Sequence, residues 1–247
     1  MEFQNKTVLI NGGASGMGLL SAQRFAALGA NVVIADANFT AASDAAQAIQ
    51  ADGGIAIAVE ADCRDYNQVK HAVQEALQLN GTIHFLLNFA GGNAARVHGR
   101  SERFADLDIE LIDWGIDVNF RGPLYYAHAV MGHMMKNKGG VIINLGSIAG
   151  ATASAAVEYS ASKTGMIGLT KSLAIYGAPY GIRACCVSPG PVLTRPEMAN
   201  MPTLLGRAAE PSEIVDLIEY LCSTKAAFIT GTDYLIDGGR NCGVRNV

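Results

Sequence analysis

The chain has 247 residues, of which half are hydrophobic and 16% are charged, so its composition excludes an intrinsically disordered protein and allows a large core. The formal net charge of −4 and the absence of basic runs speak against a nucleic-acid partner. No apolar run is long enough to span a bilayer, and the first residues show no signal-peptide pattern, so we expect no membrane association.

Cysteine and histidine usage bears on redox compartment and metal binding. The cysteines stand at 63, 185, 186, 222 and 242, an odd number without a CxxC pair, and the five histidines show no metal-ligand spacing. We therefore expect no disulfide framework, no metal site and a reduced, cytoplasmic setting.

Seven short apolar runs recur along the chain without alternating between polar and apolar residues. They cover residues 7–10, 31–36, 55–61, 84–90, 140–147, 183–190 and 233–237. Segments with helical spacing lie between them, at 16–28, 40–51, 65–79, 107–136, 158–176 and 211–223. This order is typical of an α/β fold, and it predicts one Rossmann-type doubly wound parallel sheet of about seven strands flanked by helices. We expect a single domain over residues 1–247, with a substrate loop at about 195–210.

The first predicted strand runs into a glycine-rich turn, NGGASGMG, at residues 11–18. Gly12, Gly16 and Gly18 allow a sharp turn, close approach of the backbone to a diphosphate and tight packing of helix on strand. The diphosphate then sits at a helix N-terminus, where free N–H groups favour negative charge. Glycine-rich turns are common, and it is the position between first strand and first helix that indicates a dinucleotide site.

The second predicted strand ends at Asp36, without an arginine or lysine beside it. A carboxylate at this position accepts hydrogen bonds from the adenosine ribose hydroxyls and repels a 2′-phosphate. Without the glycine turn, Asp36 would simply be a solvated residue at a strand end. Together the two features favour NAD over NADP.

A serine, a tyrosine and a lysine follow the fifth predicted strand. Ser147 ends that strand, Tyr159 comes twelve residues later, and Lys163 lies four residues further along the next predicted helix. Residues four apart share one face of a helix, so the Lys163 ammonium can approach the Tyr159 phenol. A Tyr-x-x-x-Lys spacing alone is typical of an ordinary surface helix, and its meaning depends on the rest of the chain.

Taken together and in this order, the glycine turn, Asp36 and the Ser147, Tyr159 and Lys163 set resemble the short-chain dehydrogenase/reductase family over nearly the full length. The resemblance implies a catalytic set and a set of cofactor contacts. The catalytic residues would be Ser147, Tyr159, Lys163 and Asn119. The cofactor-binding residues would be Gly12, Ser15, Gly16, Met17, Gly18, Asp36, Asp62, Cys63, Asn88, Ala90, Gly91, Tyr159, Lys163, Pro189, Val192 and Thr194.

The resemblance also implies a role for most of these residues. Asp62 would contact the adenine amino group, and the segment from Pro189 to Thr194 would hold the nicotinamide carboxamide. Ser147 would orient the substrate oxygen, and Asn119 would hold a water that connects Lys163 to solvent.

Tyr159 is expected to act as the general acid or base. Its pKa, ordinarily near 10, would have to fall by about two or three units, which corresponds to roughly 3–4 kcal/mol in favour of the phenolate. The Lys163 ammonium and a positively charged nicotinamide ring are the expected sources of that stabilisation.

The substrate class remains open between two readings. Met198, Met201, Leu204 and Leu205 give the 195–210 loop an apolar face, which favours a medium-sized, partly apolar alcohol or ketone. Arg96, His98, Arg100 and Arg103 form either a solvated rim or a site for an anionic substrate.

Three further hypotheses concern the whole protein. One alternative enzyme is a 3-oxoacyl-thioester reductase, which Asp36 disfavours because such reductases usually take NADPH. A dinucleotide-sensing binding protein is the non-enzymatic alternative. The apolar helical segments 107–136 and 158–176 and the family resemblance favour a homotetramer, in which the tail 238–247 could reach a neighbouring subunit.

Overall fold

The computed structural model describes residues 2–243, and the last four residues of the predicted inter-subunit tail lie outside this range. All seven predicted strands are present and form one parallel sheet in the order β3-β2-β1-β4-β5-β6-β7. The strands are β1 (Thr7–Asn11), β2 (Asn31–Asp36), β3 (Ile55–Glu60), β4 (Phe85–Asn88), β5 (Gly140–Leu145), β6 (Ile182–Pro189) and β7 (Asp233–Ile236). The predicted doubly wound α/β fold is thereby confirmed.

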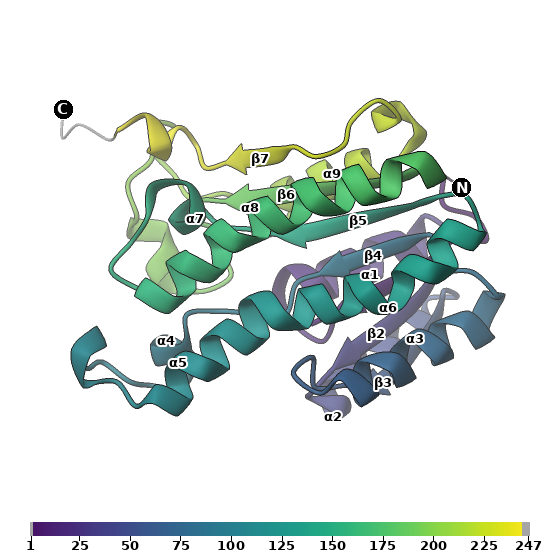
Figure 1. Ribbon diagram of the computed structural model, residues 1–247, viewed down its shortest axis with the longest axis horizontal. Coiled ribbons are helices and arrows are strands. Elements are labelled where there is room, and N and C mark those ends of the chain that lie inside the picture. The colour runs from purple at the N-terminus through teal and green to yellow at the C-terminus, as the bar shows by residue number, and fades with distance from the viewer. Residues whose placement is uncertain (1, 244–247) are drawn as a thin grey trace.

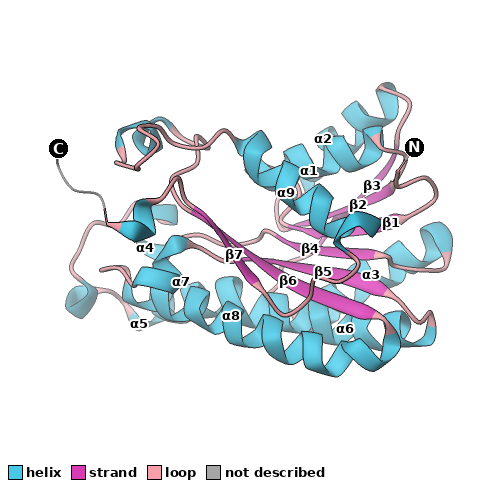
Figure 2. Cartoon of the chain, turned by 90° about the horizontal axis from the view of Figure 1, so that it is seen from above, coloured by secondary structure: helices cyan, strands magenta, loops and turns pink. Residues whose placement is uncertain are grey.

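Helices cover both faces of the sheet. They are α1 (Gly16–Ala27), α2 (Phe39–Ala51), α3 (Tyr66–Asn80), α4 (Ala94–Val97), α5 (Ile109–Ile116), α6 (Gly122–Lys136), α7 (Ile148–Thr152), α8 (Val157–Gly177) and α9 (Pro211–Cys222). Figure 2 shows α1, α2 and α9 on one face and α3, α6 and α8 on the other. The strand runs lack alternation because each face of the sheet is buried under its own helical layer.

Each helical layer encloses its own hydrophobic core. Val8 and Ile10 of β1 point into the core beneath α1, α2 and α9, whereas Leu9 points into the core beneath α3, α6 and α8. Parallel pairing sets Ile10 beside Ile34 and Leu9 beside Val33, so neighbouring strands contribute to the same core in register.

Local signals explain where several helices begin and end. Asn38 caps α2 by accepting a hydrogen bond from the Ala41 N–H at 3.2 Å, and Asp65 caps α3 in the same way through the Asn67 N–H at 2.8 Å. Helix α3 ends at Gly81, which adopts the left-handed conformation that glycine tolerates best. Helix α9 begins with a capping box formed by Glu210 and Glu213.

The predicted helix 107–136 is the main departure from the sequence expectation. It consists of α5, a π-helical turn at Asp117–Arg121 and α6. The π turn takes one more residue per hydrogen-bonded ring than an α-helix, and apolar spacing does not reveal such an insertion. Figure 1 shows α5 and α6 as one long rod that extends, together with α4, beyond the carboxyl ends of the strands.

The predicted loop 195–210 holds a short 3₁₀ helix at Pro196–Asn200 and is tied to the preceding segment by a bridge between Val192 and Ala209. Four further 3₁₀ turns are Phe104–Asp106, Ala178–Tyr180, Thr224–Ala226 and Arg240–Cys242. Among residues 2–243, no helix is both long and apolar enough to cross a bilayer.

Candidate active site at the carboxyl edge of the sheet

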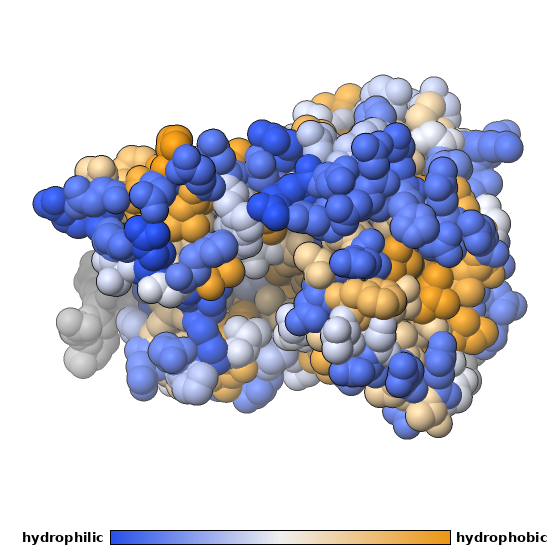
Figure 3. All heavy atoms as spheres, turned by 90° about the horizontal axis from the view of Figure 1, so that it is seen from below, coloured by the Kyte–Doolittle hydropathy of each residue, from blue (hydrophilic) through white to orange (hydrophobic). Residues whose placement is uncertain are grey.

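Two adjoining clefts lie at the carboxyl edge of the sheet, where ligands bind in open α/β folds. The larger, about 580 Å³, runs from Asp36 past the glycine turn to Thr194. The smaller, about 340 Å³, is lined by Ser147, Tyr159 and the small residues of α7. Figure 3 shows a hollow in the surface between the left-hand end of the molecule and the rest of it.

The glycine turn fits a close-lying diphosphate because side chains are sterically excluded from it. A Cβ on Gly12 would stand 2.4 Å from the Ala90 nitrogen, and one on Gly18 would stand 2.1 Å from the Gly12 oxygen. Gly16 has φ +54° and only open space where its Cβ would be. Ser15 caps α1 without a side-chain capping bond. Ser15, Gly16, Met17 and Gly18 line the cleft at this point, where the first turn of α1 has free N–H groups.

Asp36 is held at the far end of the larger cleft by two backbone donors. Its Oδ2 accepts a hydrogen bond from the Ala14 N–H at 3.0 Å, and its Oδ1 accepts one from the Asn38 N–H at 2.9 Å. Each carboxylate oxygen keeps a second acceptor site. The side chain is thus both fixed in place and able to accept ribose hydroxyls.

Asp62 and Cys63 line the same end of the cleft, but Asp62 already has a partner. Its carboxylate accepts hydrogen bonds from Arg64 at 2.5–3.0 Å, and the guanidinium holds the pKa of this carboxyl below its usual value. The expected contact of Asp62 with adenine therefore has to share the carboxylate with Arg64. Burial raises the pKa of the Cys63 thiol to about 12, so it remains an unreactive thiol packed against Gly122.

A chain of buried amides joins the strand ends under the cleft. Asn11 donates to Asn88 at 3.3 Å, Asn88 to Asn144 at 2.9 Å, and Asn144 to the Thr170 hydroxyl at 3.0 Å. These bonds fix β1, β4, β5 and α8 relative to one another. Asn88 was predicted from the sequence, whereas Asn144 and Thr170 were not, because a single polar residue inside an apolar run carries no local sign of its distant partner.

Ser147 and Tyr159 meet in the smaller cleft, from the start of α7 and the first turn of α8. The Tyr159 phenol and the Ser147 hydroxyl line the same cleft, and the Ser147 hydroxyl accepts a bond from the Ala149 N–H at 3.2 Å. Burial raises the pKa of Tyr159, and the neighbouring Ser147 hydroxyl and the charges of Arg96 and Arg195 offset part of that rise. The lowered pKa expected from the sequence is thus not reached by the side chains of the protein itself.

Lys163 is buried, with 4% of its surface exposed, and its ammonium donates to the Leu145 carbonyl at 2.7 Å. Its Nζ lies 5.7 Å from the centre of the Tyr159 ring. Burial lowers the pKa of Lys163 to about 8. The Lys163 ammonium is therefore held by the last carbonyl of β5, and Tyr159 lies further from it.

Asn119 lies fully buried in the π turn beneath the cleft. Its amide donates to the carbonyls of Gly92 and Gly115, both at 2.8 Å, and accepts the Gly92 N–H at 2.9 Å. A Cβ on Gly91 would stand 2.4 Å from the Asn119 oxygen and 3.5 Å from the Lys163 nitrogen. Asn119 thus fixes the loop that follows β4, next to Lys163.

The segment 189–195, at and after the end of β6, lines both clefts. The Gly190 N–H donates to the Ile236 carbonyl at 3.0 Å, and the Thr194 N–H donates to Val192 at 2.7 Å. Met198 and Met201 of the following loop line the smaller cleft, whereas Leu204 and Leu205 are exposed. The apolar loop face expected from the sequence is therefore formed by the two methionines alone.

The arginines expected near the rim separate into two groups. Arg100 is paired with Glu102 and Asp108, and Arg103 is paired with Asp106. Arg96 lines the larger cleft. His98 stacks edge-on against Trp114.

Among residues 2–243, no cluster of His, Cys, Asp or Glu could hold a metal ion.

A family model described as short chain dehydrogenase matches residues 6–203. The chain belongs to the short-chain dehydrogenase family. Members of this family bind a nicotinamide dinucleotide, NAD or NADP, and the short-chain dehydrogenase described here is accordingly an oxidoreductase. The glycine turn and the cleft beyond it fit such a cofactor, since they leave room and backbone donors for its diphosphate.

Named relatives include several alcohol dehydrogenases. Cyclohexanol dehydrogenase of Acinetobacter sp. strain SE19 is 35% identical, covering 96% of this chain and 95% of the relative. Trans-4-hydroxycyclohexanecarboxylate dehydrogenase of Sinomonas cyclohexanicum is 38% identical, covering 96% and 93%. Among solved structures, a short-chain type dehydrogenase/reductase from Mycobacterium marinum is 29% identical with a TM-score of 0.89, covering 98% and 97% of the two chains.

Proposed function

We propose that this short-chain dehydrogenase interconverts a secondary alcohol and the corresponding ketone, with NAD as cofactor and Tyr159 as the acid–base group. The observation that carries the proposal is that Tyr159 and Ser147 line one pocket, which adjoins the dinucleotide cleft. Bound nicotinamide accepts or donates a hydride. The remaining steps belong to the side chains.

In the proposed reaction, Ser147 donates a hydrogen bond to the substrate oxygen and orients it beside the Tyr159 phenol. Tyr159 accepts the hydroxyl proton in oxidation and donates it in reduction. Its pKa, raised by burial in the protein alone, falls when a positive nicotinamide ring stands nearby. Lys163 and Asn119, which lie next to each other behind the tyrosine, support proton exchange with solvent.

Most of the cofactor contacts predicted from the sequence line the two adjoining clefts, whereas Asn88 and Lys163 are buried and line neither. Gly12, Ser15, Gly16, Met17 and Gly18 would hold the diphosphate. Asp36, Asp62 and Cys63 line the proposed adenosine end, and Thr194 with its neighbours lies at the nicotinamide end.

NAD is the proposed cofactor because Asp36 is fixed by the Ala14 and Asn38 N–H groups and cannot swing away from a 2′-phosphate. Its negative charge would repel that phosphate at close range. Replacing Asp36 by Ser should reduce the preference for NAD over NADP by at least about tenfold. Parallel kcat/KM measurements with both cofactors test this, and an unchanged ratio in the variant would contradict it.

The reaction itself is tested by following reduced nicotinamide in the presence of cyclohexanol, 4-hydroxycyclohexanecarboxylate and meso-2,3-butanediol. These probes follow the names of relatives. Tyr159→Phe should reduce kcat by at least about 10²-fold while NADH binding persists. Tyr220→Phe, at an exposed position on α9, is the matched control. Near-normal turnover in Tyr159→Phe would refute the mechanism, and tight NADH binding without turnover of any alcohol would favour a sensor.

We further propose a cytoplasmic location, which the thiols support. Cys63, Cys185, Cys186 and Cys222 are free and buried, and Cys242 is free and exposed. A reducing compartment keeps such thiols unpaired.

A further inference from the structure

Two arginines reach the active-site clefts from loops far apart in the sequence. Arg96 lies in α4, after β4, and Arg195 lies after β6, just before the 3₁₀ helix Pro196–Asn200. Both line the dinucleotide cleft, and Arg195 also lines the pocket that contains Ser147 and Tyr159. Their charges act on the Tyr159 phenol and on each other. Two cations thus converge on the place where a substrate would lie.

Neither arginine has a close counter-ion within residues 2–243. Arg96 has no carboxylate within 4.0 Å there, in contrast to Arg100 and Arg103 of the same loop. The carboxylate nearest to Arg195 is that of Glu197, at 3.9 Å, on a side chain that is 76% exposed. Burial lowers the pKa of Arg96, and the charge of Arg195 adds to that effect, as expected for two neighbouring cations.

The backbone beneath Arg96 is shaped to admit its guanidinium. Gly92 has φ +156°, and a Cβ at this position would stand 3.0 Å from Arg96 Nη2. The Gly92 backbone is itself fixed by the Asn119 amide at 2.8 and 2.9 Å. Arg96 is therefore supported by a loop that is anchored behind the catalytic residues.

We propose that Arg96 and Arg195 together bind a carboxylate on the substrate, so that the enzyme selects hydroxy acids and oxo acids over neutral alcohols and ketones. This proposal rests on the proposed function and names its substrate class. Guanidinium groups bind carboxylates through paired, charge-assisted hydrogen bonds, and an anion between the two arginines would relieve their mutual repulsion. Arg240, which also lines the pocket, already donates to the Pro202 carbonyl at 2.6 Å.

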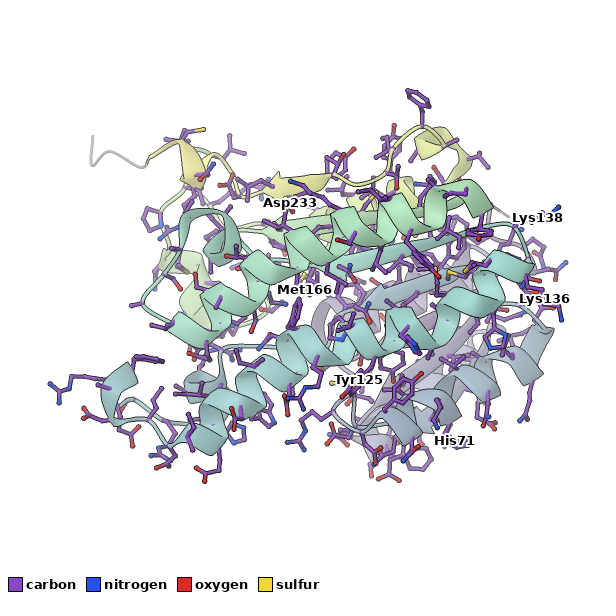
Figure 4. The ribbon with its side chains drawn as sticks, viewed as in Figure 1. His71, Tyr125, Lys136, Lys138, Met166 and Asp233 are labelled. Carbon is purple, nitrogen blue, oxygen red and sulfur yellow. The ribbon has the colours of Figure 1, made fainter. Side chains whose placement is uncertain are left out.

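The cofactor diphosphate is the other anion that the same arginines could bind, and the experiment separates the two. Initial rates are measured with 4-hydroxycyclohexanecarboxylate and cyclohexanol, which share a ring and a carbinol but differ in charge. NADH affinity is measured separately by fluorescence titration. The variants are Arg96→Gln and Arg195→Gln, with Lys136→Gln as a control. Lys136 lies at the opposite end of the molecule, near the start of β5 (Figure 4).

For a carboxylate site, each arginine variant should lose about 10- to 100-fold in kcat/KM on the acid. Because the arginine charges also act on Tyr159, turnover of cyclohexanol should fall too, but by at least about fivefold less than turnover of the acid, and the Kd of NADH should change by less than about threefold. Arg96→Lys, which keeps the charge but not the paired donors, should retain an intermediate rate. Added salt should lower kcat/KM for the acid substrate more than kcat/KM for cyclohexanol, because it screens the charge of the carboxylate.

Equal losses on the acid and on cyclohexanol, together with weaker NADH binding, would assign the arginines to the cofactor and overturn the proposal. Unchanged rates on both substrates would show a solvated rim and overturn it as well. If neither alcohol is turned over, the proposed function fails by itself, and calorimetric titration of the NADH complex with the acid decides the inference. Absence of Arg96-dependent heat would then refute it.

Discussion

Lys163 is a buried and His84 a half-buried titratable group, and the side chain of each is hydrogen-bonded to one backbone group. Lys163 donates to the Leu145 carbonyl at 2.7 Å, and His84 Nδ1 accepts the Thr7 N–H at 3.0 Å. Burial lowers the pKa of Lys163 to about 8 and that of His84 to about 4. At a given pH, a larger fraction of each side chain is neutral than in water, because burial removes the hydration of the cation.

His84 makes stability sensitive to mild acid. Its pKa falls from 6.5 in the unfolded chain to about 4 in the fold, so the unfolded state binds a proton first as the pH drops. The neutral ring contributes no penalty above pH 6.5, and stability is lost between pH 6.5 and 4. Because His84 is only half-buried, the loss should be about 1–2 kcal/mol.

Urea unfolding at pH 7.5 and at pH 5 checks this expectation. His84→Asn keeps an acceptor for the Thr7 N–H and removes the titration, so its free energy of unfolding should fall less between the two pH values than that of the wild type. His71→Asn, an exposed residue labelled in Figure 4, serves as the control. The same pH dependence in all three proteins would contradict the role of His84.

At the scale of elements, the junction between α5 and α6 determines how the active-site loop is held. The π turn at Asp117–Arg121 brings the Asn119 amide under the loop after β4, where it satisfies the backbone of Gly92 and the carbonyl of Gly115. An uninterrupted α-helix would shift the residues after the turn by one position around the axis. Through Asn119, the π turn therefore links α5 and α6, the long rod of Figure 1, to the loop beside the proposed catalytic residues.

Replacing Asn119 with Ala should lower the free energy of unfolding by about 2–4 kcal/mol, because it leaves buried backbone groups without partners. Asn137→Ala is the matched control, since the Asn137 amide makes only an exposed bond to Thr82 at 3.1 Å and should cost less than about 0.5 kcal/mol. Denaturant unfolding measures both. Equal stabilities of the two variants would show that the amide under the loop is dispensable.

At the scale of the whole molecule, the surface retains large apolar side chains at one end of the sheet. Ile175, 78% exposed, and Tyr176 lie near the end of α8, and Phe228 lies just before β7 and is fully exposed. Large apolar side chains with this degree of exposure are common on contact surfaces. Together with the apolar helices noted in the sequence, they support the proposal that the enzyme is a homotetramer.

Light scattering coupled to size-exclusion chromatography tests the assembly. The wild type should elute as a tetramer, and Ile175→Glu should shift it to smaller species because a buried charge without a partner opposes association. Lys171→Glu, one turn earlier on the same helix, should keep the tetramer. A monomeric wild type at micromolar concentration would refute the proposal.

The sequence alone was sufficient for the order of strands and helices, the parallel sheet and the glycine turn after β1, because these follow from the local spacing of apolar residues and glycines. The Ser147–Tyr159 neighbourhood was also foreseeable, since the strand end and the helix start were both readable and meet at the carboxyl edge of the sheet.

Only the tertiary structure decided what joins residues far apart in the chain. The Asn144–Thr170 bond and the Lys163–Leu145 contact depend on how α8 packs against β5, and the Asn119 support of Gly92 and the convergence of Arg96 with Arg195 depend on how the loops at the carboxyl edge are folded. Local spacing reports only which face a side chain occupies. Its partner is determined by packing between segments that the sequence keeps apart.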